Sequence, residues 1–124
     1  MNDSFMLTLK QKLAHCIEQF SSERHLYCRN PESDFTCNRK ISFSDVVHFL
    51  IEMQSKSLPN EVMDYFGHNL ETPTVSAIIQ QRDKILPSGW EHLFTLFRDE
   101  CTGLYDPMYQ GYRLLACDGS DVNI

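Results

Sequence analysis

The chain has 124 residues and a formal net charge of -6, which limits it to one modest domain and excludes a uniformly basic nucleic-acid platform. A content of 42% hydrophobic and 23% charged residues excludes wholesale disorder. No apolar run reaches the ~20 residues of a membrane helix, and the N-terminus lacks the zones of a secretory signal. We therefore expect a cytoplasmic protein with no membrane partner.

Residues 3–20 predict an amphipathic helix with a cap at Asp3. Its apolar residues recur at steps of three or four: Met6, Leu9, Leu13, Ile17 and Phe20. This spacing favours packing against a core, and a dimer or DNA-end contact is the alternative.

Residues 21–40 lack periodicity and carry the cations Arg24, Arg29, Arg39 and Lys40. Such a loop could contact phosphates in a salt-dependent way, or it could pair its own charges in solvent.

A second helix is predicted to begin at Ser42. Asp45 completes a capping box, and Ile41 and Val46 occupy the positions of a hydrophobic staple. The helix is apolar on more than one face, so we expect it to be central to a bundle. We expect His48, within it, to be a core side chain rather than a ligand.

Two further helices are predicted, one from Pro59 to Gly67 and one from a cap at Thr72 to about Lys84. Two helices joined by a turn that contains glycine are typical of a helix-turn-helix DNA-binding motif. A helical wheel places four polar residues opposite the apolar stripe as candidate readers of DNA: Ser76, Gln80, Gln81 and Lys84. The alternative is an ordinary solvated polar face. Arg82 projects toward the apolar side and is expected to be partly buried against a carboxylate.

A last helix is predicted from a capping box at Ser88–Glu91 to about Cys101, with Trp90 as a core anchor. After a break over residues 102–110, the apolar run 112–117 predicts a buried strand that ends on Asp118 and Gly119. A carboxylate delivered at a strand end beside glycine suits metal binding.

The five cysteines form no Cys-x-x-Cys pair, which favours free thiols in a reducing compartment. A zinc site built on His25, Cys28 and Cys37, with a fourth ligand such as His15, is the alternative.

Three stretches carry a family resemblance: DFTCNRKISF (residues 34–43), TPTVSAIIQQRDKI (72–85) and LLACDGSD (114–121). Together, and in this order, they resemble stretches of bacterial insertion-sequence transposases of the insertion-sequence-four type. Cys37 stands where the family usually carries Arg.

The resemblance implies a mainly α fold, with a helical DNA-binding and assembly domain over residues 1–103. Residues 104–124 would begin a truncated ribonuclease H-like catalytic domain. Asp118 would be the first acid of an Asp-Asp-Glu triad and a ligand of Mg²⁺ or Mn²⁺, with Asp121 a weaker candidate. Double-stranded DNA at transposon ends would be the partner, contacted by Arg39, Lys40 and the four reader residues.

The chain ends at Ile124, before the second Asp and the Glu of that triad. One carboxylate cannot hold two metals, so we expect no cofactor and no catalysis from this polypeptide alone. A homodimer is compatible with the sequence. The alternative function is a small acidic helical scaffold that binds protein and has no nucleic-acid role.

Overall fold

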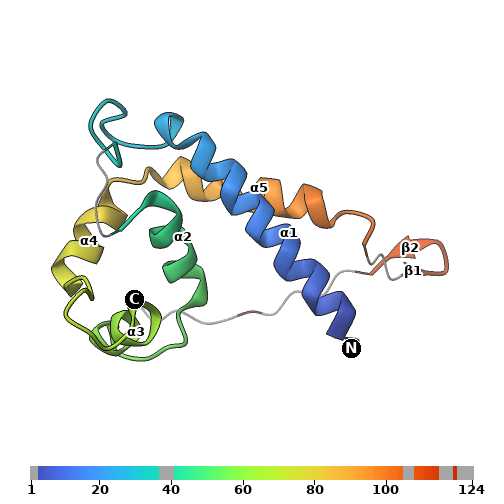
Figure 1. The fold of residues 1–124 in the computed structure, drawn as a ribbon. Helices are drawn as coiled ribbons and strands as arrows, with labels where there is room; N and C mark the ends of the chain where they lie inside the picture. The colour runs from blue at the N-terminus through green and yellow to red at the C-terminus, as the bar shows by residue number, and fades with distance from the viewer. Residues whose placement is uncertain (1–2, 37–40, 105–107, 115–118, 120–124) are drawn as a thin grey trace.

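A computed structural model describes residues 3–36, 41–104, 108–114 and 119, and these form a mainly helical fold (Figure 1). The elements, in chain order, are α1 (Asp3–Ser22), the 3-10 turn η1 (Arg24–Leu26), α2 (Phe43–Glu52), α3 (Leu58–Phe66), α4 (Val75–Asp83), α5 (Pro87–Cys101), β1 (Met108–Tyr109) and β2 (Tyr112–Arg113). The prediction of about five helices is confirmed for the described residues. The ribonuclease H-like continuation stays a prediction.

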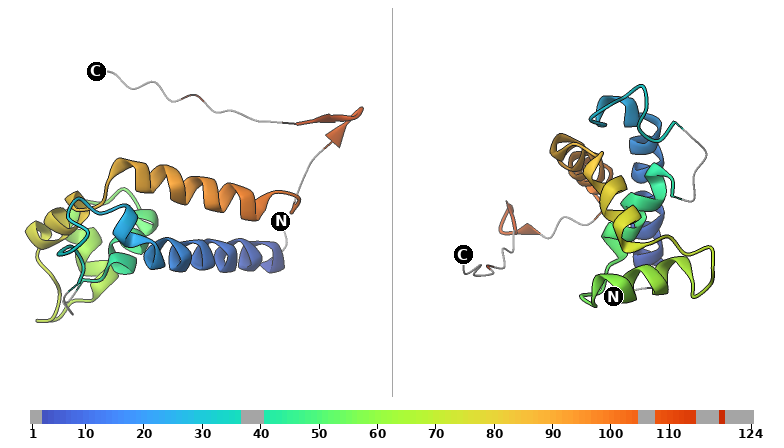
Figure 2. Two further views of the ribbon diagram at one scale, coloured as in Figure 1. Left: turned by 90° about the horizontal axis from the view of Figure 1, so that it is seen from above. Right: turned by 90° about the vertical axis from the view of Figure 1, so that its left-hand side faces the viewer.

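Helices α1 and α5 lie side by side and antiparallel, with α2, α3 and α4 gathered beside the C-terminal half of α1 (Figure 2). Near the C-terminal end of α5, Lys12 Nζ in the middle of α1 lies 3.6 Å from Glu100 Oε2. At the other end, the rings of Phe20 and Trp90 lie 6.2 Å apart. The two long helices therefore form a frame to which the three shorter helices are attached.

The core is centred on Phe20, which is fully buried near the end of α1. Its ring meets Phe43 of α2 edge-on at 4.9 Å and Tyr27 at 5.7 Å. Gly89 of α5 lets the two long helices approach, since an added Cβ would lie 3.0 Å from Phe20 Cζ and 3.0 Å from Tyr27 Cβ. The other fully buried large side chains come from α1, α2 and α4: Cys16, Ile17, Val46, Val47, Phe49 and Ile78.

Helix boundaries confirm some sequence predictions and correct others. Ser42 and Asp45 form the predicted capping box of α2, and Gly67 ends α3 with a φ of 91°. The cap of α4, however, is Thr74 and not Thr72: its hydroxyl accepts the Ala77 amide at 3.1 Å.

Helix α5 begins at Pro87 rather than at the predicted box of Ser88 and Glu91. Proline in the first turn has no backbone N–H group, so one fewer donor at the start of the helix needs a hydrogen-bond partner from a side-chain cap. Trp90 packs against the core as predicted.

Glu61 fixes the connection between α2 and α3. Although only 5% exposed, its Oε1 atom accepts the backbone amides of Gln54 at 2.7 Å and Lys56 at 2.8 Å. Two charge-assisted hydrogen bonds to one buried carboxylate hold this loop against α3.

The chain after α5 forms a short antiparallel hairpin in place of the predicted buried strand. Met108 pairs with Arg113 and Tyr109 pairs with Tyr112, and all four are exposed. Leu114 is also exposed. A two-stranded ribbon has no second layer to bury its apolar residues, so the burial that the apolar pattern predicted is wrong for residues 112–114. Residues 115–118 lie outside the described part of the chain.

Within the described residues, no helix combines the length and the apolar content needed to cross a membrane.

We predict that Gly89→Ala destabilises the protein, although alanine favours helix by about 1 kcal/mol. Forcing a methyl group against the Phe20 ring and the Tyr27 Cβ atom should cost about 1–3 kcal/mol. Urea unfolding would measure the change, and Ser88→Ala, at an exposed site one residue away, is the control. A more stable Gly89→Ala protein would show that the two helices do not pack this closely.

We predict that Glu61→Ala lowers the free energy of unfolding by about 1–3 kcal/mol, because two amides lose their charged acceptor. Glu61→Gln should lose less, since the amide oxygen can still accept both bonds. Asp64 lies on α3, as Glu61 does, and is an exposed ion-pair partner of Lys56. Asp64→Ala should therefore have the smallest effect. Chemical denaturation of the three variants tests this order, and equal losses would contradict it.

Candidate nucleic-acid interface

The candidate DNA reader, α4, is oriented by its apolar side. Ile78 is buried, and Val75 and Ala77 pack against the core. The opposite arc leaves Ser76 and Gln80 exposed. These two residues are four apart, so they lie one above the other on the same face of the helix.

Ser76 and Gln80 form one continuous polar surface. Gln80 Nε2 donates to Ser76 Oγ at 3.3 Å. The bond is long and exposed, so both groups could exchange it for hydrogen bonds to a base edge at small cost. A glutamine amide can donate and accept in the bidentate pattern that adenine presents in the major groove. These two predicted reader residues are therefore accessible and suited to that role.

Gln81 is buried and Lys84 is hydrogen-bonded to it, so these two predicted readers are less accessible than Ser76 and Gln80. Gln81 is only 8% exposed and its Oε1 accepts from Lys84 Nζ at 3.1 Å. Lys84 Nζ also lies 5.6 Å from the centroid of the Phe35 ring, within cation–π range. The reason is helical geometry: Gln81 follows the buried Ile78 by three residues and so shares its face.

Arg82 also departs from its prediction. It is exposed rather than partly buried, and its Nη2 lies 3.3 Å from Asp83 Oδ1. The predicted carboxylate partner is present, but it is the next residue and is also exposed. Such a pair contributes little stability and leaves the guanidinium available.

Arg29 is brought to the C-terminal end of α4 by backbone pairing. Cys28 forms an isolated antiparallel bridge with Ile85, and the Arg29 amide donates to the Lys84 carbonyl at 2.9 Å. Arg29 Nε donates to the Asp83 carbonyl at 2.5 Å. Its exposed position there complements the negative end of the helix dipole.

The sequence identified Arg29 as one of four loop cations, but it gave no signal for this location. The pairing joins segments more than 50 residues apart, and no local pattern reports such a contact. Two other predicted contacts, Arg39 and Lys40, lie outside the described residues.

The connection between α3 and α4 is longer than that of a compact helix-turn-helix. It spans eight residues, 67–74, whereas the motif uses a turn of three or four. Residues in this connection are tied locally, as where Glu71 donates its amide to Asn69 Oδ1 at 2.9 Å. Helix α4 still contacts α3, so the departure from the motif lies in the length of the connection.

The predicted metal ligands cannot be located: Asp118, Asp121 and Cys37 lie outside the described residues. Across the residues that are described, no three His, Cys, Asp or Glu side chains are grouped so as to hold a metal ion. Cys28 is buried, and burial, followed by the nearby Asp34 carboxylate, raises the pKa of its thiol.

Comparison with known proteins gives no relative for this chain, since it matches no family model, no curated protein and no solved structure.

Proposed function

We propose that this chain is a DNA-binding region of a transposase of the insertion-sequence-four type, acting in DNA transposition. The proposal starts from the three ordered sequence resemblances. The structural observation that carries it furthest is the exposed Ser76 and Gln80 face of α4, with Arg29 held at the C-terminal end of the same helix. In this arrangement the polar face reads base edges and the arginine contacts a phosphate.

The charges around α4 support DNA binding at this surface, although the chain as a whole has a net negative charge. Residues 75–84 contain two cations, Arg82 and Lys84, and one acid, Asp83. Arg29 adds a third cation at their end. Each phosphate neutralised by such a residue releases counterions, so binding would weaken as salt is raised.

The proposal assigns DNA binding, and not strand cleavage, to the described residues. Cutting and joining DNA by two metal ions requires several converging carboxylates. By the resemblance, Asp118 would supply one of them. Mg²⁺ or Mn²⁺ would be the cofactor of the full-length relative, since both prefer oxygen ligands.

We predict salt-dependent binding of the purified chain to duplex DNA, measured by fluorescence anisotropy across a salt series. Arg29→Ala should weaken binding to all duplexes alike and reduce the salt slope by about 1, as expected for one lost phosphate contact. Ser76→Ala and Gln80→Ala should instead reduce discrimination between preferred and unrelated sequences, by about 1–3 kcal/mol for a bidentate contact.

Arg98→Ala is the control for the loss of one exposed arginine, because Arg98 lies on α5, outside the proposed surface, and pairs only with the adjacent Asp99 among the ion pairs of the described residues. Its loss should leave binding unchanged. If the unmodified chain binds no duplex at low salt, including candidate terminal repeats, the DNA-binding proposal is wrong. That result would favour the acidic protein-binding scaffold.

A further inference from the structure

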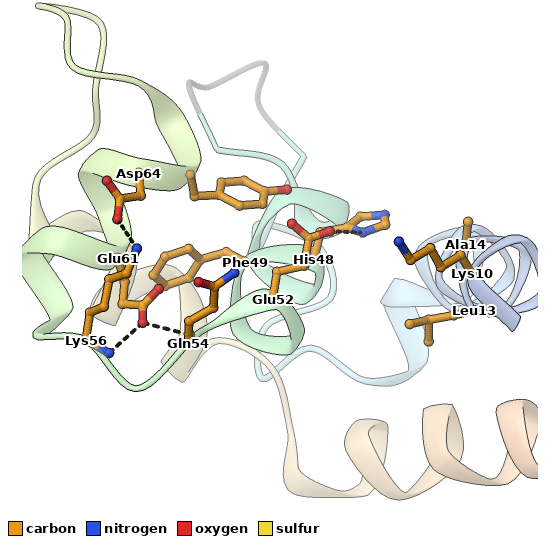
Figure 3. A pocket seen from close by; sticks show the side chains of 11 residues that line it. Lys10, Leu13, Ala14, His48, Phe49, Glu52, Gln54, Lys56, Glu61 and Asp64 are labelled. Carbon is orange, nitrogen blue, oxygen red and sulfur yellow. Dashed lines mark hydrogen bonds and ion pairs between the residues drawn. The ribbon is translucent and has the colours of Figure 1, made fainter. Parts of the chain in front are cut away.

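Charged side chains of the described residues also gather away from α4. One cluster lines an open groove of about 800 Å³ between α1 and α3, with α2 along its floor (Figure 3). Its charges pair with one another, since Lys56 lies 2.5 Å from Asp64 and His48 lies 3.8 Å from Glu52. A second cluster joins η1 to α5 and belongs to the connection that carries Arg29, so it bears directly on the proposed DNA contact.

The turn η1 is anchored to α5 by one histidine. His92 Nε2 lies 2.6 Å from Glu23 Oε2, and the two residues are 69 positions apart in the sequence. The His92 ring also stacks on Tyr27, with ring centroids 4.7 Å apart and an interplanar angle of 20°. Glu23 precedes η1 and Tyr27 follows it, so a single side chain of α5 holds both ends of the turn.

Arg24 is the residue that this anchored turn presents to solvent. Its side chain is exposed, and its Nη1 donates to the Ser21 carbonyl in a long hydrogen bond of 3.4 Å. A guanidinium has five N–H donors, so this bond leaves others for a ligand. Planar pairs of such donors match the oxygens of a phosphate.

The electrostatic environment of Cys28 places Arg24 near the end of α4. Burial raises the pKa of the Cys28 thiol, Asp34 raises it further, and the Arg24 and Lys84 cations act in the opposite direction. Cations from η1 and from the end of α4 therefore both lie within electrostatic range of Cys28. Arg29 is the next residue, and the five residues from Arg24 to Arg29 span at most about 18 Å.

The accessible charge of this segment is positive, although the chain as a whole is acidic. No Asp or Glu occurs between residues 24 and 31. Glu23, immediately before it, is paired with His92. Beyond the segment, Glu32 is exposed, but Asp34 is buried and accepts the Asn30 amide at 2.9 Å.

We propose that residues 24–29 form a phosphate-binding strip of the DNA surface, in which Arg24 contacts a phosphate in addition to the one at Arg29. Glu23 and His92 are positioning residues that hold Arg24 in place. The inference rests on the proposed DNA-binding function and extends its contacts from α4 to η1. Because the turn is fixed at both ends, less conformational freedom is lost on binding than in a flexible loop.

Fluorescence anisotropy of the full chain with a panel of unrelated duplexes, across a salt series, tests the strip. Arg24→Ala should weaken binding to all duplexes alike and lower the salt slope by about 1. Glu23→Ala should also weaken binding, although it removes a negative charge, because η1 loses its anchor. Glu91→Ala is the matched control: it removes the same charge from an exposed site next to His92 and should not weaken binding.

Two further variants separate positioning from a direct contact. His92→Phe keeps a ring against Tyr27 but removes the ion pair, and it should weaken binding as Glu23→Ala does. The double variant Glu23→Ala/Arg24→Ala should lose less affinity than the sum of the two single losses, because Glu23 acts through Arg24. Amide spectra show whether each variant is folded.

A salt slope that falls in Arg29→Ala but not in Arg24→Ala would overturn the strip and leave DNA binding at α4 standing. Equal affinities of Glu23→Ala and Glu91→Ala, or additive losses in the double variant, would overturn the positioning role. Failure of the unmodified chain to bind any duplex would overturn both this inference and the proposed function.

Discussion

The packing of Phe20 against Gly89 is the contact on which the rest of the structure depends. Because position 89 has no side chain, α5 approaches α1 closely enough for Phe20 to meet Phe43, Tyr27 and Trp90 at once. A fully buried aromatic side chain contributes on the order of 2–3 kcal/mol by transfer from water. One residue near the end of α1 thereby fixes the long helix pair, α2 and the chain that follows η1.

That packing also determines where the candidate DNA surface lies. Tyr27 is both a neighbour of Phe20 and the acceptor of the Leu86 amide at 2.8 Å. The residues after Tyr27 therefore run beside the end of α4, which brings Arg29 to the Asp83 carbonyl. The aromatic core and the exposed cation are consecutive parts of one connection, so a core defect at position 89 would be expected to displace the surface as well.

The negative charge of the chain is distributed unevenly, so the surface around α4 and the groove between α1 and α3 differ in charge. Several acids are committed to structure: Asp45 caps α2, Glu61 holds a loop, and Asp34 Oδ2 accepts the Asn30 amide at 2.9 Å. These carboxylates contribute to the net charge of -6 but already accept backbone hydrogen bonds. Around α4 the accessible charges are chiefly cationic, whereas the α1–α3 groove presents both signs. Net charge alone would have concealed this separation.

Local sequence determined the number of helices, the capping box at Ser42, the stop at Gly67 and the core role of Phe20, because capping and apolar periodicity act over only a few residues. It also determined the exposed Ser76 and Gln80 pair, since their spacing is a property of one helix. Tertiary structure alone decided that His48 lines a groove rather than the core and that Arg29 meets the end of α4. Those outcomes depend on which distant segment packs against each residue, and the free energy of that choice is spread over the whole core rather than encoded in any single stretch of sequence.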